Sequence, residues 1–467
     1  MPQQHFNALQ FEETIPEQPS LTDTGDFVWG VASSSYQTEG ASTHEGKGPS
    51  IWDTFVEKKG KILFNHTAKE ATNFFHLYKD DIQLLKAMGI GNFRFSISWP
   101  RVIPDGKGII NIKGLDFYDR LVDELLLHDI TPWITLYHWD LPHALESKGG
   151  WTNREIITWF SRYAEVVVKR LGDRVKNWMV LNEPVVYTGA GYFLGVHAPG
   201  RKGMENFIPA VHHTAIVQAE GIRLIKSLYP DSNVGTTFSC SYITPYRNIE
   251  KDILAANRVD ALLNRLYVEP LLGLGYPLKT LPMLQRIDKY FKAGDEKRIA
   301  CNPDFIGIQN YTREVVRHSW ITPYLKARLV NAKTRNVERT VMNWEVYPDS
   351  LYHMLMQYSA YPQLKKILVT ENGAAFPDQL IDDEVHDPKR REFIQSCIHS
   401  MLKAKAAGAK VHGYFAWSFT DNFEWTEGFV PRFGLVYVDY KTQKRIVKSS
   451  GLWYGKFVSE KNLAGKK

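Results

Sequence analysis

The feature that most constrains the fold is a regular alternation of short apolar runs with longer amphipathic stretches, from Phe27 to the end of the chain. Eight runs have the length and apolar content of buried parallel strands, namely 28–33, 92–98, 132–137, 178–182, 233–239, 305–309, 367–370 and 411–417. Between them apolar residues recur at spacings of three and four. This pattern predicts helices over ranges that include 71–88, 112–128, 154–171, 210–228 and 389–407.

Eight strand-then-helix units predict a fold of the α/β class, a single (β/α)8 barrel. A chain of 467 residues could hold about three average domains, but no linker, low-complexity tract or internal repeat divides this one. We expect a polar extension over 1–26, the barrel over 27–457 and a basic tail over 458–467. An open doubly wound sheet is the alternative. It would carry a glycine-rich loop after its first strand, whereas 33–37 reads Ser-Ser-Ser-Tyr-Gln.

Composition and charge exclude several classes of protein. The net charge of +6 comes from interleaved acids and bases without a basic face, so we expect no nucleic-acid partner. No run approaches the roughly 18 apolar residues of a membrane span, and 1–26 lacks the pattern of a signal peptide. Cys240, Cys301 and Cys397 are far apart and lack metal-ligand spacing. We therefore expect a cytoplasmic protein without metal or other cofactor, and the sequence leaves its oligomeric state open.

Two glutamates, Glu183 and Glu371, stand at the ends of strand-like runs, and each is followed within two residues by Pro or Gly. Because the carboxyl ends of barrel strands converge on one mouth, these side chains should face each other across one cleft. Such a pair can break a glycosidic bond: one carboxyl protonates the leaving oxygen and the other attacks the anomeric carbon. A surface role for each glutamate is the alternative, which the presence of both disfavours.

Other polar and aromatic residues at the same strand ends form the candidate binding site. They are Gln37, Arg94, His138, Trp139, Asn182, Gln309, Tyr311, Trp417, Glu424 and Trp425. Amides and carboxylates hydrogen-bond hydroxyls and indoles stack on ring faces, so the set suits a neutral polyhydroxylated ligand. A metal-binding His138 is the alternative, but no His-x-His or His-Glu-x-x-His pattern accompanies it. His212 and His213 lie within a helical pattern and are predicted to be structural.

Six segments then allow a comparison with a known family. They are 27–40 (Phe-Val-Trp-Gly-Val-Ala-Ser-Ser-Ser-Tyr-Gln-Thr-Glu-Gly), 93–99 (Phe-Arg-Phe-Ser-Ile-Ser-Trp), 136–142 (Leu-Tyr-His-Trp-Asp-Leu-Pro), 181–184 (Leu-Asn-Glu-Pro), 370–373 (Thr-Glu-Asn-Gly) and 417–425 (Trp-Ser-Phe-Thr-Asp-Asn-Phe-Glu-Trp). In sequence and order they resemble the signature motifs of the family-one glycoside hydrolases, the β-glucosidase family. The resemblance runs from Phe27 to about Gly455.

The resemblance implies a retaining double displacement, with Glu183 as acid/base and Glu371 as nucleophile, their carboxyl groups about 5 to 5.5 Å apart. It implies that Arg94 keeps Glu371 ionised, that Tyr311 bonds Glu371, and that Glu183 stays protonated. The residues implied to hold the non-reducing sugar are Gln37, His138, Asn182, Glu424 and Trp425, with Trp417 as the stacking platform.

Three further expectations follow from the same resemblance. Trp344 resembles a tryptophan on the leaving-group side, with loop packing as the alternative. Gln309 stands where many members have Asn, so it should reach a sugar hydroxyl from a shifted backbone, and the fine sugar preference stays open. Glu424 meets the outer hydroxyls of the sugar, and its charge should repel a 6-phosphate.

The function predicted first is a β-glucosidase acting on small β-glucosides or cello-oligosaccharides, with a small-molecule carbohydrate as its partner. A transglycosylase would use the same two glutamates and stays open as a second function. A non-catalytic carbohydrate- or protein-binding relative is disfavoured, because both carboxylates stand beside Arg94 and Tyr311. A thioglucosidase is disfavoured because that branch lacks the acid that Glu183 supplies.

Overall fold

The computed structural model describes residues 27–464 and contains the predicted barrel. Eight parallel strands close in the order β1-β13-β10-β7-β5-β4-β3-β2. They are β1 (Val28–Ala32), β2 (Asn92–Ser96), β3 (Thr131–Tyr137), β4 (Asn177–Asn182), β5 (Asn233–Ser239), β7 (Phe305–Gln309), β10 (Ile367–Asn372) and β13 (Val411–Trp417). The eight predicted strands agree with these bounds to within two residues at each end, so the open-sheet alternative is excluded.

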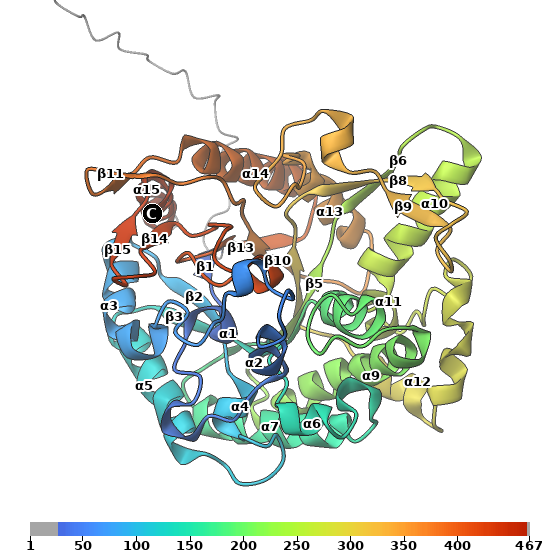
Figure 1. Cartoon of the computed structure of the whole chain (residues 1–467), viewed down its shortest axis with the longest axis horizontal. Coiled ribbons are helices and arrows are strands. Elements are labelled where there is room, and N and C mark those ends of the chain that lie inside the picture. The colour runs from blue at the N-terminus through green and yellow to red at the C-terminus, as the bar shows by residue number, and fades with distance from the viewer. Residues whose placement is uncertain (1–26, 465–467) are drawn as a thin grey trace, which may run out of the picture.

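Amphipathic helices surround the barrel, as Figure 1 shows. The longer ones are α3 (Phe74–Ala87), α5 (Ile112–Leu127), α7 (Ile156–Leu171), α9 (Met204–Leu228), α10 (Glu250–Asp260), α13 (Asp349–Ser359), α14 (Pro388–Ala406) and α15 (Ser449–Ala464). In α7 the side chains of Phe160, Tyr163 and Val167 are buried at spacings of three and four. This apolar stripe packs the helix against the barrel, because an amphipathic helix is stable only when that face is covered.

Loops at the strand ends carry shorter elements that the sequence did not predict. The short helices are α1 (Ser35–Thr38), α2 (Ile51–Val56), α4 (Trp99–Val102), α6 (His143–Glu146), α8 (Pro184–Val186), α11 (Val268–Leu271) and α12 (Asp295–Ile299). The 3-10 helices are η1 (His44–Gly46), η2 (Leu63–Asn65), η3 (Gly150–Thr152), η6 (Pro282–Tyr290), η7 (Ala332–Arg335) and η8 (Trp425–Glu427), and η4 (Tyr187–Leu194) and η5 (Ala261–Arg265) are π-helical.

Three small sheets also form outside the barrel. The first pairs β6 (Tyr242–Pro245), β8 (Arg313–His318) and β9 (Ala327–Leu329); the others pair β11 (Leu380–Ile381) with β12 (Glu384–Val385) and β14 (Val436–Val438) with β15 (Arg445–Val447). Ala255 and Val259 of α10 pack on Val316 and Ala327, which covers one face of the first sheet.

Large side chains fill the inside of the barrel. The ring of Trp133 on β3 lies 5.4 Å from that of Phe415 on β13 and 5.9 Å from that of Phe305 on β7. Neither strand is a neighbour of β3 in the barrel, so these contacts cross its interior. Because the interior is packed, a ligand can reach only the mouth formed by the carboxyl ends of the strands.

The predicted C-terminal boundary is wrong. Helix α15 continues to Ala464, and Val458, assigned to a basic tail, is fully buried. The hydroxyl of Tyr454 donates to the carbonyl of Gly30 at 2.8 Å, and the ring of Phe457 lies 5.0 Å from that of Trp29. These apolar contacts outweigh the basic composition, so the helix belongs to the barrel domain. The predicted extension over 1–26 lies outside the described residues. Across 27–464, no helix combines the length and apolarity needed to cross a bilayer.

Candidate active site

Glu183 and Glu371 line one cavity of about 300 Å³ at the barrel mouth. Glu371 lies within β10, and Glu183 follows the last residue of β4 directly. Glu183 has left-handed backbone angles (φ 46°, ψ 64°), and Pro184 begins the next helix at once. An L-residue pays roughly 1–2 kcal/mol for this conformation, which the neighbouring structure holds in place. The chain thus turns from strand to helix at the glutamate itself, which directs its side chain into the mouth.

The carboxylate of Glu371 receives three hydrogen bonds. Arg94 Nη1 donates to Oε1 at 2.5 Å, Gln309 Nε2 donates to Oε1 at 2.9 Å, and the Tyr311 hydroxyl donates to Oε2 at 2.6 Å. Burial raises the pKa of Glu371, while the charge of Arg94 and the bond from Tyr311 oppose that rise. The expected contacts are therefore present, but the sequence-based argument left out burial, which is the larger influence on this pKa.

The pKa of Glu183 is raised more strongly than that of Glu371. Burial, followed by the nearby charge of Glu371, raises the pKa of Glu183 well above its ordinary value. Arg94 and the hydroxyl of Ser239 oppose the rise to a smaller extent. Two carboxyl groups in one buried cavity do not both ionise readily, so one proton stays with the pair. The donors around Glu371 place that proton on Glu183, as the sequence predicts.

The amide of Asn182 determines the protonation of His138. Arg94, Gln309 and Thr237 donate to Asn182 Oδ1 at 2.5, 2.6 and 3.1 Å, so the amide nitrogen is the atom 3.1 Å from His138 Nε2. His138 Nε2 must then accept and Nδ1 must carry the hydrogen. Burial and the charge of Arg94 lower the pKa of His138 well below its usual range, so the ring is neutral. Its buried Nδ1 has no hydrogen-bond partner among the described residues, which leaves a donor for a ligand hydroxyl.

Glu424 and three tryptophans form the wall around His138. The ring of Trp425 lies 4.5 Å from that of Trp139 and 5.9 Å from that of His138, which also lies 6.1 Å from Trp417. Burial, followed by the charge of Glu371, raises the pKa of Glu424 to about 8. The Glu424 carboxyl is therefore largely protonated at neutral pH. This corrects the sequence-based argument, which gave Glu424 a full charge.

The structure brings all the predicted site residues together in two layers. The cavity surface includes Glu183 and Glu371 with His138, Trp139, Tyr311, Trp344, Trp417, Glu424 and Trp425. Four others lie behind it with no exposed surface: Gln37, Arg94, Asn182 and Gln309. The ligand contacts that the sequence predicts for Gln37, Asn182 and Gln309 stay predictions, and the structure shows that each is also bonded to a neighbouring site residue.

Gln309 shows such contacts within the site most clearly. Its amide nitrogen contacts Asn182, Thr237 and Glu371, so it positions the nucleophile. The reason is geometric: Gln309 ends β7, which pairs with both β5 and β10, and its long side chain turns inward between them. Trp344 lines the cavity and its ring lies 5.4 Å from that of Tyr311, so it makes a packing contact, while its place on the leaving-group side stays a prediction.

Sequence reasoning missed several residues of the cavity wall. They include Val186, His197, Ser239, Cys240, Ser241, Leu263, Thr312, Glu314, Met342, Thr426, Glu427 and Phe433. Ser239 ends β5, so the rule that selected the other strand ends could have found it. Glu314 lies on β8 in the small sheet, and burial raises its pKa to about 7. Most of the others lie in loops without a periodic pattern.

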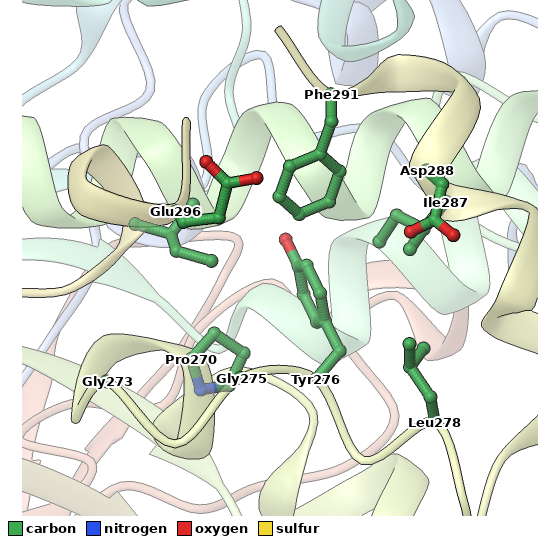
Figure 2. A pocket seen from close by; sticks show the side chains of 10 residues that line it. Pro270, Gly273, Gly275, Tyr276, Leu278, Ile287, Asp288, Phe291 and Glu296 are labelled. Carbon is green, nitrogen blue, oxygen red and sulfur yellow. The ribbon is translucent and has the colours of Figure 1, made fainter. Parts of the chain in front are cut away.

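A second cavity, of about 430 Å³, is lined by residues between Pro270 and Ile299 (Figure 2). Its wall includes Tyr276, Asp288, Phe291 and Glu296 and neither of the two central glutamates. The hydroxyl of Tyr276 lies 3.2 Å from Nδ1 of His212, whose Nε2 lies 2.9 Å from Asp295. Nδ1 of His213 bonds the carbonyl of Trp151 at 2.9 Å. Both histidines are thus held in structural contacts, as the sequence predicts. Within residues 27–464, no group of three or more His, Cys, Asp or Glu side chains could hold a metal ion.

Fold and site together define a class: a (β/α)8 glycoside hydrolase with two carboxyl groups in different protonation states and a sugar-sized cavity walled by indoles. The chain belongs to glycosyl hydrolase family 1, whose model matches residues 21–463.

Individual relatives are similar over nearly the whole chain. β-Glucosidase A from Thermotoga maritima is 40% identical over 94% of this chain and 98% of its own. The 1,4-β-D-glucan glucohydrolase from Thermotoga neapolitana is 39% identical over the same shares. The solved structure of the Thermotoga maritima β-glucosidase in complex with deoxynojirimycin has a TM-score of 0.90 at 40% identity, covering 93% of this chain and 98% of that one.

Proposed function

We propose that this enzyme is a retaining β-glucosidase that releases terminal non-reducing β-D-glucosyl residues from small β-glucosides by double displacement. The observation that carries the proposal is the contrast between Glu371, held by three donors, and Glu183, whose pKa is raised in the same cavity. The names of the relatives support glucose as the sugar.

In the first step the Glu371 carboxylate attacks the anomeric carbon while Glu183 gives its proton to the glycosidic oxygen. The bond to the aglycone breaks, the aglycone leaves as an alcohol, and a glycosyl ester forms on Glu371. Forming the ester consumes the charge of Glu371, and the pKa of Glu183 falls because that charge helped to raise it.

In the second step Glu183 is therefore a base. It takes a proton from water, and the resulting hydroxide attacks the anomeric carbon and releases Glu371. Two inversions give net retention. The neutral His138 donates from Nδ1 to a sugar hydroxyl, and Glu424 hydrogen-bonds the outer hydroxyls, while Trp417 stacks on the ring. The predicted carboxyl separation of about 5 to 5.5 Å stays a prediction, which a crystal structure would test.

The test is to trap the glycosyl ester. With an activated 2-deoxy-2-fluoroglucoside the enzyme should gain the mass of one fluoroglucosyl group, and peptide mapping should place the group on Glu371. The Glu371→Gln variant is the matched control and should not be labelled. Proton NMR should show the β-anomer as the first product. Release of the α-anomer, or a label on another residue, would refute the proposal.

Product analysis separates hydrolysis from transglycosylation. With cellobiose alone glucose should dominate, whereas a transglycosylase would convert most of the substrate to longer sugars even without an added acceptor. A cytoplasmic location is also proposed. It is supported by Cys240, Cys301 and Cys397, none of which forms a disulfide.

A further inference from the structure

A third cavity of about 290 Å³ adjoins the catalytic cavity. The two share one wall, formed by Val186, Ser239, Cys240, Ser241 and Leu263. Beyond that wall the lining is apolar and is formed by Val185, Gly189, Ala190, Phe193, Leu194, Phe207, Leu262, Met283 and Leu325. We call this space the apolar annex.

The annex is built by the π-helical segments η4 and η5, together with Met283 of η6 and the loop residue Leu325. Phe193, Leu262, Met283 and Leu325 are only half-buried, and Leu194 is 56% exposed. Apolar side chains usually gain by losing contact with water, so a concave group of partly exposed ones favours a ligand that covers them.

The annex adjoins the catalytic cavity close to Glu183, the residue that would protonate the leaving group. Val186 stands three residues after Glu183, and its amide donates to the Glu183 carbonyl at 2.9 Å. His138, Trp417 and Glu424, which meet the sugar, line the catalytic cavity but not the annex. A glucoside with its sugar among those residues and its glycosidic oxygen at Glu183 therefore directs its aglycone toward the shared wall.

Backbone polar groups of Cys240 and Ser241 in the shared wall are already engaged. The Ser241 amide donates to Asn264 Oδ1 at 3.1 Å, and Asn264 Nδ2 donates to the Ser241 carbonyl at 2.9 Å. The Cys240 carbonyl accepts from Asn310 Nδ2 at 2.9 Å, and burial raises the pKa of the Cys240 thiol. A sugar aglycone would leave hydroxyl groups without partners against the apolar lining beyond this wall, which is costly, whereas an alkyl or aryl group loses nothing.

We propose that the apolar annex binds the aglycone and that the preferred substrates are β-glucosides of apolar alcohols, with alkyl or aryl aglycones, rather than glucosides whose aglycone is another sugar. This substrate class rests on the proposed β-glucosidase function, which it makes more specific.

The test fills the annex from one position. A Cβ added at Gly189 meets no atom within 4 Å, so Gly189→Leu extends its side chain into the annex without a clash at its base. Gly91 offers the same open surroundings away from the annex, which makes Gly91→Leu the matched control. For each protein, kcat/KM is measured on methyl and hexyl β-glucoside and on cellobiose, and Ki is measured for alkyl β-thioglucosides of one to eight carbons.

In the unchanged enzyme and in Gly91→Leu, hexyl glucoside should exceed both methyl glucoside and cellobiose in kcat/KM by at least tenfold. The Ki should fall about two- to fourfold per added methylene, the range that burial of a methylene group allows, until the annex is filled. Gly189→Leu should lose that dependence on chain length while its kcat/KM on methyl glucoside stays within about threefold.

Two results would overturn the inference while leaving the proposed β-glucosidase function intact. The first is hydrolysis of methyl glucoside or cellobiose without any gain from a longer alkyl chain. The second is an equal loss of kcat/KM on all substrates in Gly189→Leu. If no β-glucoside is hydrolysed, the proposed function fails and the inference fails with it. The Ki series separates these cases, because it reports binding without turnover.

Discussion

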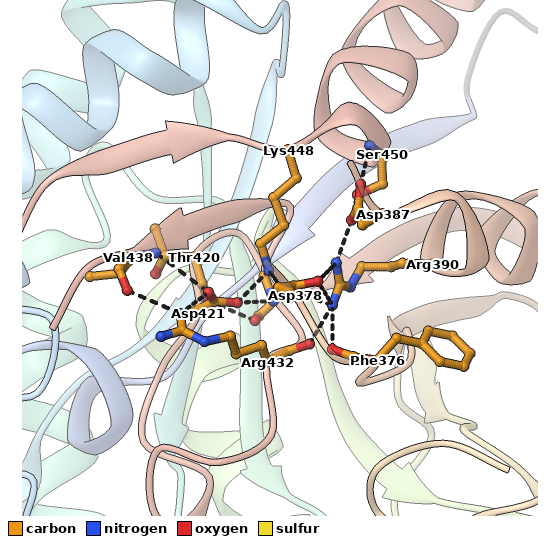
Figure 3. Close-up of polar contacts among 12 residues, drawn as sticks. Phe376, Asp378, Asp387, Arg390, Thr420, Asp421, Arg432, Val438, Lys448 and Ser450 are labelled. Carbon is orange, nitrogen blue, oxygen red and sulfur yellow. Dashed lines mark hydrogen bonds and ion pairs between the residues drawn. The ribbon is translucent and has the colours of Figure 1, made fainter. Parts of the chain in front are cut away.

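Replacement of Lys448 by methionine should destabilise the protein strongly, because Lys448 belongs to a buried ionic network (Figure 3). The network contains three acids and three bases: Asp378, Asp387, Asp421, Arg390, Arg432 and Lys448. Lys448 Nζ lies 2.5 Å from Asp378 and 2.6 Å from Asp421, and these three side chains have no exposed surface. The network joins the loop after β10 to the loop after β13, which carries Glu424 and Trp425.

The magnitude follows from the charge balance. Lys448→Met keeps most of the side-chain volume but leaves three buried acids with two bases, and removing one partner of a buried pair costs about 3–5 kcal/mol. We expect a cost at the lower end of this range, because both acids still have an ion-pair partner in the variant. Asp378 pairs with Arg390 at 3.0 Å and Asp421 pairs with Arg432 at 2.5 Å. With an m-value of about 3 kcal/mol/M, the urea midpoint should fall by about 1 M.

Urea unfolding at pH 7, followed by tryptophan fluorescence, is the assay. Lys389→Met is the control, since Lys389 pairs with Glu338 on the surface at 63% and 56% exposure, and such pairs contribute about 0–1 kcal/mol. Adding Asp378→Asn to Lys448→Met restores the balance and should recover at least about 1 kcal/mol. If Lys448→Met costs no more than the control, or the double variant is simply additive, the charge-balance reasoning is wrong.

Four further predictions concern the catalytic site. Glu371→Ala should lose turnover by several orders of magnitude, and added azide should then yield the α-glucosyl azide; near-native hydrolysis or a β-azide would exclude Glu371 as nucleophile. Glu183→Gln should still react in a burst with a dinitrophenyl glucoside, whose leaving group needs no proton, but be nearly inert on cellobiose; equal losses on both would place the acid elsewhere. Plain glucosides should be preferred over 6-phosphoglucosides in kcat/KM, and the preference should widen above about pH 8 as Glu424 ionises; a higher value for the phosphoglucoside would contradict this. Because the pKa of Glu424 is raised from 4.5 to about 8, the folded state keeps a proton that the unfolded chain loses. The unchanged enzyme should therefore lose stability relative to Glu424→Gln as the pH rises from 5 to 8. A difference in urea midpoint between the two proteins that stays constant across that range would count against the raised pKa of Glu424.

The sequence alone determined the barrel and its catalytic pair. Strand and helix periods are local properties, so eight apolar runs located all eight strands to within two residues. Glu183 and Glu371 could be placed on one cleft because the carboxyl ends of barrel strands always share one mouth. The motifs around them then supplied roles that match the hydrogen bonds of Arg94 and Tyr311.

Only the tertiary structure decided how the side chains around that pair divide their work. The inward turn of Gln309 depends on the two strands that flank β7 in the barrel, β5 and β10. These two strands are far apart in the sequence, since β5 ends at Ser239 and β10 begins at Ile367. The raised pKa of Glu424 depends on burial, and the end of α15 depends on apolar contacts with β1. The apolar annex is formed by residues from six separate segments of the chain with no common period. Each of these features comes from contacts between distant segments, which local patterns of a single sequence do not encode.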